Sequence, residues 1–421
     1  MKDNKIKQTA PTRIPSTEHK INESLICEHA REITEKLIRA NYQAYLVGGC
    51  VRDLLLGKEP KDFDIATNAH PEEICELFDN SRIIGRRFRI VHIYQHRHFI
   101  EVSTFRALNK QKNSDTQVTN GRILRDNTFG SIEEDAYRRD FTINSMYYDI
   151  ASHEVLDFCG GMEDINNKAI RMIGDDVVTR YHEDPVRILR ALRFHAKLEL
   201  EIEEATLKPI PELIHLLTDI SPSRLFDEVL KLFHSGHAVK CFKAIDQYGL
   251  IKLLFPMTHA ARKNNKQFDT LIYIALENTD SRIRQGKPVN PAFIFAILLW
   301  QPYLEQIEKF KKDGISYAEC AWEAGRLTVS TQSSLINIPK RFSIAICEIW
   351  KLQRRLLRKY GYKTLKLLEH PRFRAAYDFM CLRAQAGEID EYECSWWTKI
   401  QEVSPAEQKQ MTRYKPKHNK K

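Results

Sequence analysis

A glycine turn between two short apolar segments constrains the fold of this chain more than any other feature. Residues 45–57 read YLVGGCVRDLLLG, so that a strand-like segment gives way to a helix-like one at Gly48 and Gly49. Glycine lets backbone N–H groups come close to a bound anion. Arg52, in the first turn of the expected helix, can bind a phosphate with two hydrogen bonds. The stretch predicts a strand, a phosphate-binding turn and a helix that ends before Gly57.

Two carboxylates follow this turn. Asp62 and Asp64 flank Phe63 in the sequence KDFDIAT. In a strand both carboxylates would point to one face, because side chains alternate. Two neighbouring like charges repel unless a cation lies between them, and oxygen ligands completed by substrate phosphates are typical of magnesium. We therefore expect Asp62 and Asp64 to be metal ligands and catalytic residues in an attack on a nucleotide phosphate.

A second charged segment follows a predicted helix. The sequence RRDFTIN places two arginines, Asp140 and an amide in residues 138–144. A phosphoryl transferase needs a third carboxylate near its metal ions and cations that hold the triphosphate. Glu101, on an alternating segment expected to be a neighbouring strand, is the other candidate for that carboxylate. The sequence leaves this choice open.

A third segment, EDPVRILRALRF, spans residues 183–194. Asp184 suits the N-cap of a helix, and Pro185 suits its first position. An aspartate beside Arg187 offers hydrogen-bond acceptors and donors that can read the edge of a nucleobase. Arg190 and Arg193 continue a basic ridge along the same predicted helix.

Together these segments resemble the signature of the polymerase-β-type nucleotidyltransferases. More narrowly, they resemble the bacterial group that holds the tRNA CCA-adding enzymes and the poly(A) polymerases. The resemblance implies that Asp140 completes the catalytic carboxylates and that Arg139 contacts the triphosphate. It also implies a nucleotide-binding set made of Gly48, Gly49, Arg52, Arg139, Asp184, Arg187, Arg190 and Arg193.

Three segments resemble the poly(A) polymerase branch in particular. They are IIGRRFRIVHI at residues 83–93, a long polar insertion before residues 124–130, and an arginine-rich region at 370–383 with a basic tail. The resemblance implies a template-independent enzyme that adds AMP from ATP to RNA 3′ ends and releases pyrophosphate. Two Mg²⁺ ions, or Mn²⁺, would assist it. It also implies a role in RNA decay, with RNA-decay enzymes and an RNA chaperone as partners.

Three alternatives remain open from the sequence. One is tRNA CCA addition, which uses the same chemistry with a site that must accept both C and A. Another is an RNA-binding protein without catalytic activity, against which the intact Asp62, Asp64 and Asp140 argue. The last is a small-molecule nucleotidyltransferase, which the basic helices disfavour.

Helical periodicity dominates from His182 onward, so the predicted fold class is α+β, with a mixed-sheet head followed by an all-α neck, body and C-terminal region. A segment at 107–120 is polar without periodicity and is expected to be a flexible loop. Cations and aromatic residues alternate at 353–362 and 370–379, where we expect RNA phosphates and unpaired bases to bind. The expected domains are a disordered segment (1–20), a catalytic head (21–180), a neck that recognises the base and RNA (181–240), a helical body with an arginine-rich RNA-binding region (241–405) and a basic disordered tail (406–421).

The composition agrees with a nucleic-acid enzyme. The 421 residues are 43% hydrophobic and carry a formal charge of +9, which favours a polyanionic partner. The nine cysteines include no Cys-x-x-Cys pair, so we expect neither a zinc site nor disulfides, and a reduced, cytoplasmic chain. The longest apolar run, Ala292–Trp300, is too short to span a bilayer. We expect a monomer that is not an integral membrane protein.

Overall fold

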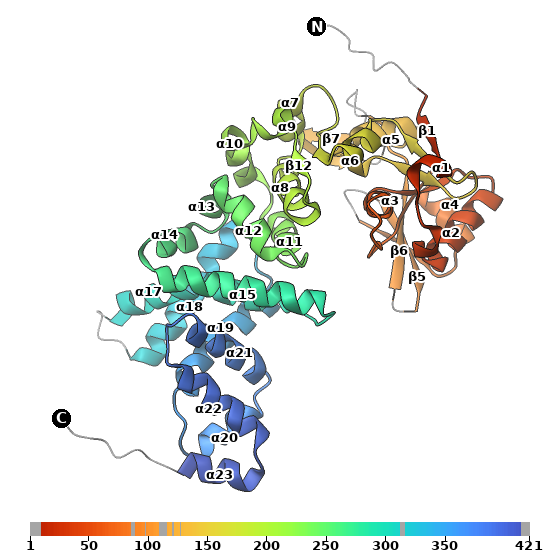
Figure 1. Cartoon of the computed structure of the whole chain (residues 1–421). Helices are drawn as coiled ribbons and strands as arrows, with labels where there is room; N and C mark the ends of the chain where they lie inside the picture. The colour runs from red at the N-terminus through yellow and green to blue at the C-terminus, as the bar shows by residue number, and fades with distance from the viewer. Residues whose placement is uncertain are drawn as a thin grey trace. The chain divides into compact units, whose positions relative to one another are not determined.

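The computed structural model describes residues 10–85, 89–96, 98–108, 116–119, 122–126, 128–311 and 316–413. The chain divides into two compact units, residues 1–213 and 214–421. Figure 1 labels the elements of both units. In the described part of the chain, no helix is long and apolar enough to cross a membrane.

An eight-stranded mixed sheet forms the centre of the first unit (Figure 1). The pairing of β3 with β6 is parallel, and the other neighbours in this sheet are antiparallel. This arrangement confirms the predicted α+β head. In spatial order the strands are β1 (Thr12–Pro15), β10 (Glu154–Asp157), β9 (Tyr147–Asp149), β2 (Ala44–Val47), β3 (Asp64–Thr67), β6 (His98–Thr104), β5 (Ile90–Gln95) and β4 (Ser81–Ile84).

The two faces of this sheet carry different side chains because residues alternate along each strand. Ile65, Val91 and Val102 lie on one face and are fully buried. Helix α2 (Glu28–Arg39) packs against β2 and β3, and helix α4 (Pro71–Leu77) packs against β4 and β5. On the other face Val47, Ala66, Phe105 and Tyr147 form a buried cluster with Ala136 of α5 (Ile132–Arg138). The buried cluster fixes the sheet register, because a shift by one residue would expose all of its members.

The predicted glycine turn joins β2 to α3 (Gly49–Leu55). Gly48 has φ of +80°, a conformation that side chains disfavour, and Gly57 follows the helix with φ of +68°. Both turns were predicted from the sequence. The remaining elements of the first unit are α1 (Ser16–His19), η1 (Glu23–Leu25), β7 (Thr116–Thr119), β8 (Arg122–Asp126), η2 (Thr142–Asn144), α6 (Gly161–Asn166), β11 (Ala169–Ile170), α7 (Val177–Glu183), α8 (Val186–Leu198), β12 (Glu201–Ile202), α9 (Glu204–Leu207) and α10 (Ile210–Leu213).

Two expectations of disorder in this unit are wrong in part. Residues 12–19 form β1 and α1, because β1 adds to the sheet edge by pairing with β10 and buries Ile14. Residues 116–119 belong to a hairpin of β7 and β8 rather than to a loop. Residues 1–9 and 109–115, on which the rest of these predictions fall, lie outside the described residues.

The described elements of the second unit are all helical, as predicted. In chain order they are η3 (Ile214–Asp219), α11 (Pro222–Phe233), α12 (Ala238–Gln247), α13 (Leu250–Leu254), α14 (Pro256–Asn264), α15 (Lys266–Arg284), α16 (Pro291–Leu298), α17 (Trp300–Lys311), α18 (Tyr317–Leu335), α19 (Lys340–Leu356), α20 (Tyr362–Leu368), α21 (Phe373–Gln385), α22 (Glu391–Glu402) and α23 (Pro405–Arg413). The expected disordered tail from residue 406 is therefore helical up to Arg413, and residues 414–421 are not described.

The C-terminal helices contain a disulfide that the sequence analysis excluded. Cys381 on α21 and Cys394 on α22 are bonded, with their Cα atoms 4.9 Å apart, while the other seven cysteines are free. Helices α21 and α22 pack against each other around Phe373, Met380 and Trp397. The pairing depends on this tertiary contact, so the spacing of the cysteines could not predict it.

Candidate active site

Two carboxylates stand side by side on the parallel strands of the sheet. Asp64, the first residue of β3, pairs in register with Glu101 of β6, so both side chains lie on the same face. The side chain of Glu101 is 45% exposed. Asp62 is also exposed but lies in a bend before β3, so the predicted strand holds only the second of the two aspartates.

The carboxylates of this cluster repel one another. The pKa of Asp64 is raised to about 6, because the surrounding protein removes part of the hydration of its carboxylate and because Glu101 and Asp62 are negatively charged, while Arg139 offsets part of this effect. A divalent cation bound to these oxygens would remove the repulsion. The described residues contain no group of three His, Cys, Asp or Glu side chains close enough to hold a metal on their own. A metal held by two carboxylates has coordination positions open to water or to substrate oxygens.

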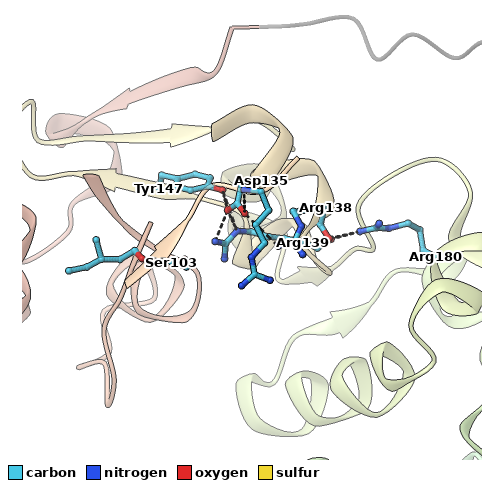
Figure 2. Close-up of polar contacts among 8 residues, drawn as sticks. Ser103, Asp135, Arg138, Arg139, Tyr147 and Arg180 are labelled. Atoms are coloured by element: carbon cyan, nitrogen blue, oxygen red, sulfur yellow. Dashed lines mark hydrogen bonds and ion pairs between the residues drawn. The ribbon is translucent and has the colours of Figure 1, made fainter. Parts of the chain in front are cut away.

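An arginine is fixed above the glycine turn. Arg139 donates hydrogen bonds to the Asp135 carboxylate (2.8 Å) and to the Tyr147 hydroxyl (3.3 Å), and that hydroxyl donates to Asp135 (2.7 Å). Figure 2 shows Arg139 between these two residues. A Cβ atom added to Gly48 would lie 3.4 Å from Arg139 Nη1, so the guanidinium faces the turn at close range. The arrangement provides a cation beside the backbone predicted to bind phosphates.

A second network links the turn to the basic helix α8. Arg52 is 3% exposed; its Nη1 donates to Asn144 Oδ1 (2.6 Å), and its Nη2 donates to Asp53 (2.7 Å). Asn144 Nδ2 lies 3.4 Å from Asp140 Oδ1, and Arg190 Nε lies 2.7 Å from Asp140 Oδ2. Three of the predicted site residues, Arg52, Asp140 and Arg190, are thus brought into one network.

The two candidates for the third carboxylate lie in different surroundings. Asp140 is 9% exposed and accepts a hydrogen bond from the Phe141 N–H (2.8 Å). Its pKa is lowered despite burial, chiefly by the positive charge of Arg190 and by that hydrogen bond. Glu101, in contrast, lies in register with Asp64 and raises the pKa of that residue. The structure therefore places Glu101, rather than Asp140, beside Asp64.

The predicted base-reading segment forms the corner between α7 and α8. Asp184 ends α7 instead of capping α8, whose N-cap is Pro185. Arg187 is 7% exposed and donates to Glu183 Oε2 (3.1 Å) and to the Arg180 carbonyl (2.6 Å). The partner of this arginine is therefore Glu183, which lies four residues before it.

Several residues of the site were not singled out from the sequence. Phe194 lies beside three guanidinium groups, those of Arg193 (4.5 Å), Arg52 (5.2 Å) and Arg190 (6.0 Å from ring centroid). Arg180 donates to the backbone carbonyls of Arg138 and Arg139, as Figure 2 shows. The spacing of Asp135 and Arg139 on one predicted helix was a signal that could have revealed their ion pair. No sequence signal pointed to Arg180 or Phe194.

The fold and this site define a nucleotidyltransferase of the polymerase-β type. Solved structures of CCA-adding enzymes share the fold. An apo form II of a CCA-adding enzyme aligns with a TM-score of 0.61 at 21% identity, over 92% of this chain and 87% of that chain. A tRNA nucleotidyltransferase complexed with a primer tRNA and an incoming ATP analog aligns with a TM-score of 0.55 at 22% identity, over 88% and 99% of the two chains.

Sequence comparison narrows this class. Three family models match the chain: the Poly A polymerase head domain (residues 44–171), the probable RNA and SrmB-binding site of polymerase A (199–262) and the polymerase A arginine-rich C-terminus (313–421). Poly(A) polymerase I of Salmonella typhi is 45% identical over 95% of this chain and 88% of its own length. That of Haemophilus influenzae is 42% identical over 93% and 89%.

The chain belongs to the bacterial poly(A) polymerase I family, which confirms the resemblance inferred from its motifs. The CCA-adding enzyme of Bacillus pumilus is more distant, at 31% identity over 73% of this chain and 76% of its own length.

Proposed function

We propose that this chain transfers AMP from ATP to the 3′ end of RNA and releases pyrophosphate, without a template. Its relatives named Poly(A) polymerase I align over nearly the whole chain. The structural observation that carries the proposal is the pair Asp64 and Glu101, in register on neighbouring strands next to the Gly48 turn and Arg139. These residues would form a metal-binding surface beside a phosphate-binding turn.

Asp62 and Asp64 would hold two divalent ions, for which we propose Mg²⁺. When bound, the ions would activate the RNA 3′-hydroxyl and neutralise charge on the α-phosphate and the leaving pyrophosphate. Of the two candidates for the third carboxylate, the geometry favours Glu101, because it adjoins Asp64 while Asp140 is engaged by Arg190. Asp140 would then position Arg190 and Asn144 next to the nucleotide.

The triphosphate would lie on the backbone of Gly48 and Gly49, with Arg139 as its cation. Asp184 and Arg187 would select adenine, with Arg187 oriented by Glu183. Arg52, Arg190 and Arg193 complete this proposed nucleotide-binding set around Phe194. The fixed hydrogen bonds of Arg139 and Arg187 support a preorganised site, which lowers the cost of binding a polyanion.

We extend the proposal to the cell by family resemblance. The chain would act as a monomer in the cytoplasm on transcripts destined for decay. RNA-decay enzymes and an RNA chaperone would be its partners. These roles would be tested by recovery of RNA-dependent and RNA-independent complexes of the full chain.

The deciding experiment supplies the purified chain with Mg²⁺, an oligo(A) primer and each nucleoside triphosphate separately. A tRNA that lacks its CCA end serves as a parallel substrate. We expect long products from ATP on the primer, lost in Asp62→Asn and Asp64→Asn but retained in Asp79→Asn, an exposed aspartate of the same unit. Products that stop at CCA and require CTP would instead indicate tRNA repair. RNA binding without any incorporation would indicate a binding protein without catalytic activity.

A further inference from the structure

Three aromatic rings gather on the surface of strands β5 and β6, which lie side by side in Figure 1. The His92 and Phe99 rings stack with centroids 4.1 Å apart and an interplanar angle of 10°. Tyr94 lies 6.0 Å from Phe99. Phe99 is 47% exposed and Tyr94 is 37% exposed, so large parts of both rings face solvent. We refer to these three residues as the aromatic cluster.

The aromatic cluster does not belong to the hydrophobic core. Val91, Ile93, Ile100 and Val102 alternate with its members along the same strands and are buried on the opposite face. Exposed aromatic rings cost solubility without adding to the core. Their exposure leaves these rings available to a binding partner.

The aromatic cluster continues the row of catalytic carboxylates. His92 pairs in register with Glu101, which pairs in register with Asp64. Phe99 lies two residues before Glu101 on β6, so the two side chains share a face about 7 Å apart. Arg82 of the edge strand β4 pairs in register with His92 and is exposed. The carboxylates, the rings and this cation thus follow one another across one face of the sheet.

The order of the strands separates the two sides of the reaction. The glycine turn follows β2, which borders β3 on one side, whereas the aromatic cluster lies on β6 and β5, on the other side of β3. Phosphoryl transfer places the attacking oxygen and the leaving group roughly in line on opposite sides of the phosphorus. If the triphosphate lies on the side of β2, the attacking 3′-hydroxyl must approach from the side of β6.

We propose that the aromatic cluster is the subsite that stacks the unpaired terminal bases of the RNA acceptor. Arg82 binds a phosphate of the same strand. This inference rests on the proposed function and adds the location of the acceptor to it. Stacking on a ring suits an acceptor whose sequence varies, because every base has a π face. It also explains how the 3′-hydroxyl is held beside Asp64 without a template.

The test uses an oligo(A) primer with 2-aminopurine at its 3′ terminus, whose fluorescence is quenched by stacking. The protein carries Asp62→Asn, so that binding is observed without turnover. We expect quenching on binding, loss of most of that quenching in Phe99→Leu and its recovery in Phe99→Trp. In the otherwise native enzyme, Phe99→Leu should raise the KM for the primer about tenfold, the order of one lost base stack, and leave the KM for ATP unchanged.

A matched control is Trp322→Leu, which removes an exposed ring of the second unit (66% exposed). It should leave the quenching at saturating RNA intact. Equal quenching by the protein with Phe99 and by the Phe99→Leu variant would overturn the proposed subsite. A changed KM for ATP with an unchanged KM for the primer would also overturn it. Failure of the proposed function would differ from both, because the native chain would then add no AMP to any primer. Thermal unfolding of each variant checks that it is folded.

Discussion

At the residue scale, Asp64 shows the repulsion between the carboxylates of the candidate site. Its carboxyl has a raised pKa because the surrounding protein removes part of its hydration and because Glu101 and Asp62 are negatively charged. Such a cluster lowers stability unless a cation compensates it, which is common where function requires the charges. Both the metal affinity and the stability of the chain should therefore depend on the protonation of Asp64, and so on pH.

We predict that Asp64→Asn stabilises the metal-free chain while abolishing activity. The native pKa of about 6 lies above the ordinary value, so the folded state takes up a proton as the pH falls through 6. The cost of the charge is thus fully present above pH 6 and is lost progressively as the pH falls from about 6 toward the ordinary aspartate value of 3.8. Thermal unfolding in a chelator should give a higher Tm for the variant at pH 7.5 and a smaller difference between the two proteins at pH 5. A variant that is less stable at pH 7.5 would contradict this account.

Tyr147 provides a second prediction at this scale. Its hydroxyl joins Asp135 to Arg139, so Tyr147→Phe removes two hydrogen bonds without changing the ring. We expect a loss of stability of about 1 kcal/mol and a severalfold rise in the KM for ATP, because Arg139 is held less firmly. Tyr148→Phe is the matched control, since its hydroxyl bonds to Glu23 on the opposite face of the same strand. It should cost similar stability with no change in KM, and an equal rise in both variants would refute the role of Arg139.

At the scale of elements, the corner between α7 and α8 links the proposed base-reading residues to the proposed phosphate site. Glu183 accepts hydrogen bonds from Arg187 (3.1 Å) and Arg180 (2.9 Å). The pKa of Arg180 is lowered to about 10, first by burial and then by the charge of Arg187. Arg180 in turn holds the carbonyls of residues 138 and 139. One carboxylate therefore balances two buried cations.

We predict that Glu183→Gln weakens the preference for ATP. Loss of the negative charge leaves Arg187 without its ionic partner, so its guanidinium is no longer fixed where it can read a base. The ratio of kcat/KM for ATP to that for CTP should fall by about tenfold, the effect of roughly 1.4 kcal/mol. Glu204→Gln, an exposed carboxylate of the same unit, should leave the ratio unchanged. An unchanged ratio in Glu183→Gln would show that Glu183 does not contribute to the choice between ATP and CTP.

Prediction from sequence worked for elements whose signal is local. The turn at Gly48 and the end of α3 at Gly57 follow from residue types that few other conformations accommodate. The β1 strand was missed because its stability comes from pairing with β10, some 140 residues away in sequence.

The aromatic residues of the C-terminal helices show the same limit. Phe373, Tyr377 and Phe379 were expected to stack on RNA bases, yet they are at most 9% exposed. Their spacing fits a buried helix face as well as a binding face, and only tertiary packing separates the two. Tyr362, at 71% exposed, remains available to RNA.

At the scale of the whole molecule, the two units differ in their covalent constraints. The disulfide between Cys381 and Cys394 closes a loop with a sequence separation of 13 within the second unit. A loop of this size stabilises the folded state by about 3 kcal/mol in the chain-entropy description. The site residues of the first unit owe nothing to this bond, since they all precede residue 214.

We predict that reduction selectively destabilises the second unit. Calorimetry of the full chain should show a transition that moves to lower temperature in dithiothreitol and in Cys381→Ser. Cys347→Ser, which changes a free cysteine of the same unit, should leave that transition in place. Addition of ATP and Mg²⁺ should raise the temperature of the first unit's transition only, because the proposed nucleotide-binding residues lie in that unit. A thermogram unchanged by reduction would show that the two thiols are not bonded in solution.

The units should also contribute to RNA binding by different physical means. Exposed cations lie along the last turns of α19, in the segment after it and in α20. They are Lys351, Arg354, Arg355, Arg358, Lys363 and Lys366. Cations that neutralise phosphates release counterions, so their contribution to affinity falls steeply with salt, whereas base stacking contributes little to this slope.

We therefore predict that Arg355→Ala with Arg358→Ala reduces the slope of log K against log salt by about 1.4, or roughly 0.7 for each lost phosphate contact with single-stranded RNA. Phe99→Leu should lower the affinity at every salt concentration and leave the slope unchanged, because it removes a ring and no charge. Titration of a labelled oligo(A) at several salt concentrations measures both quantities. A slope that changes in Phe99→Leu but not in the arginine pair would reverse the assignment and place the main phosphate contacts on the sheet of the first unit.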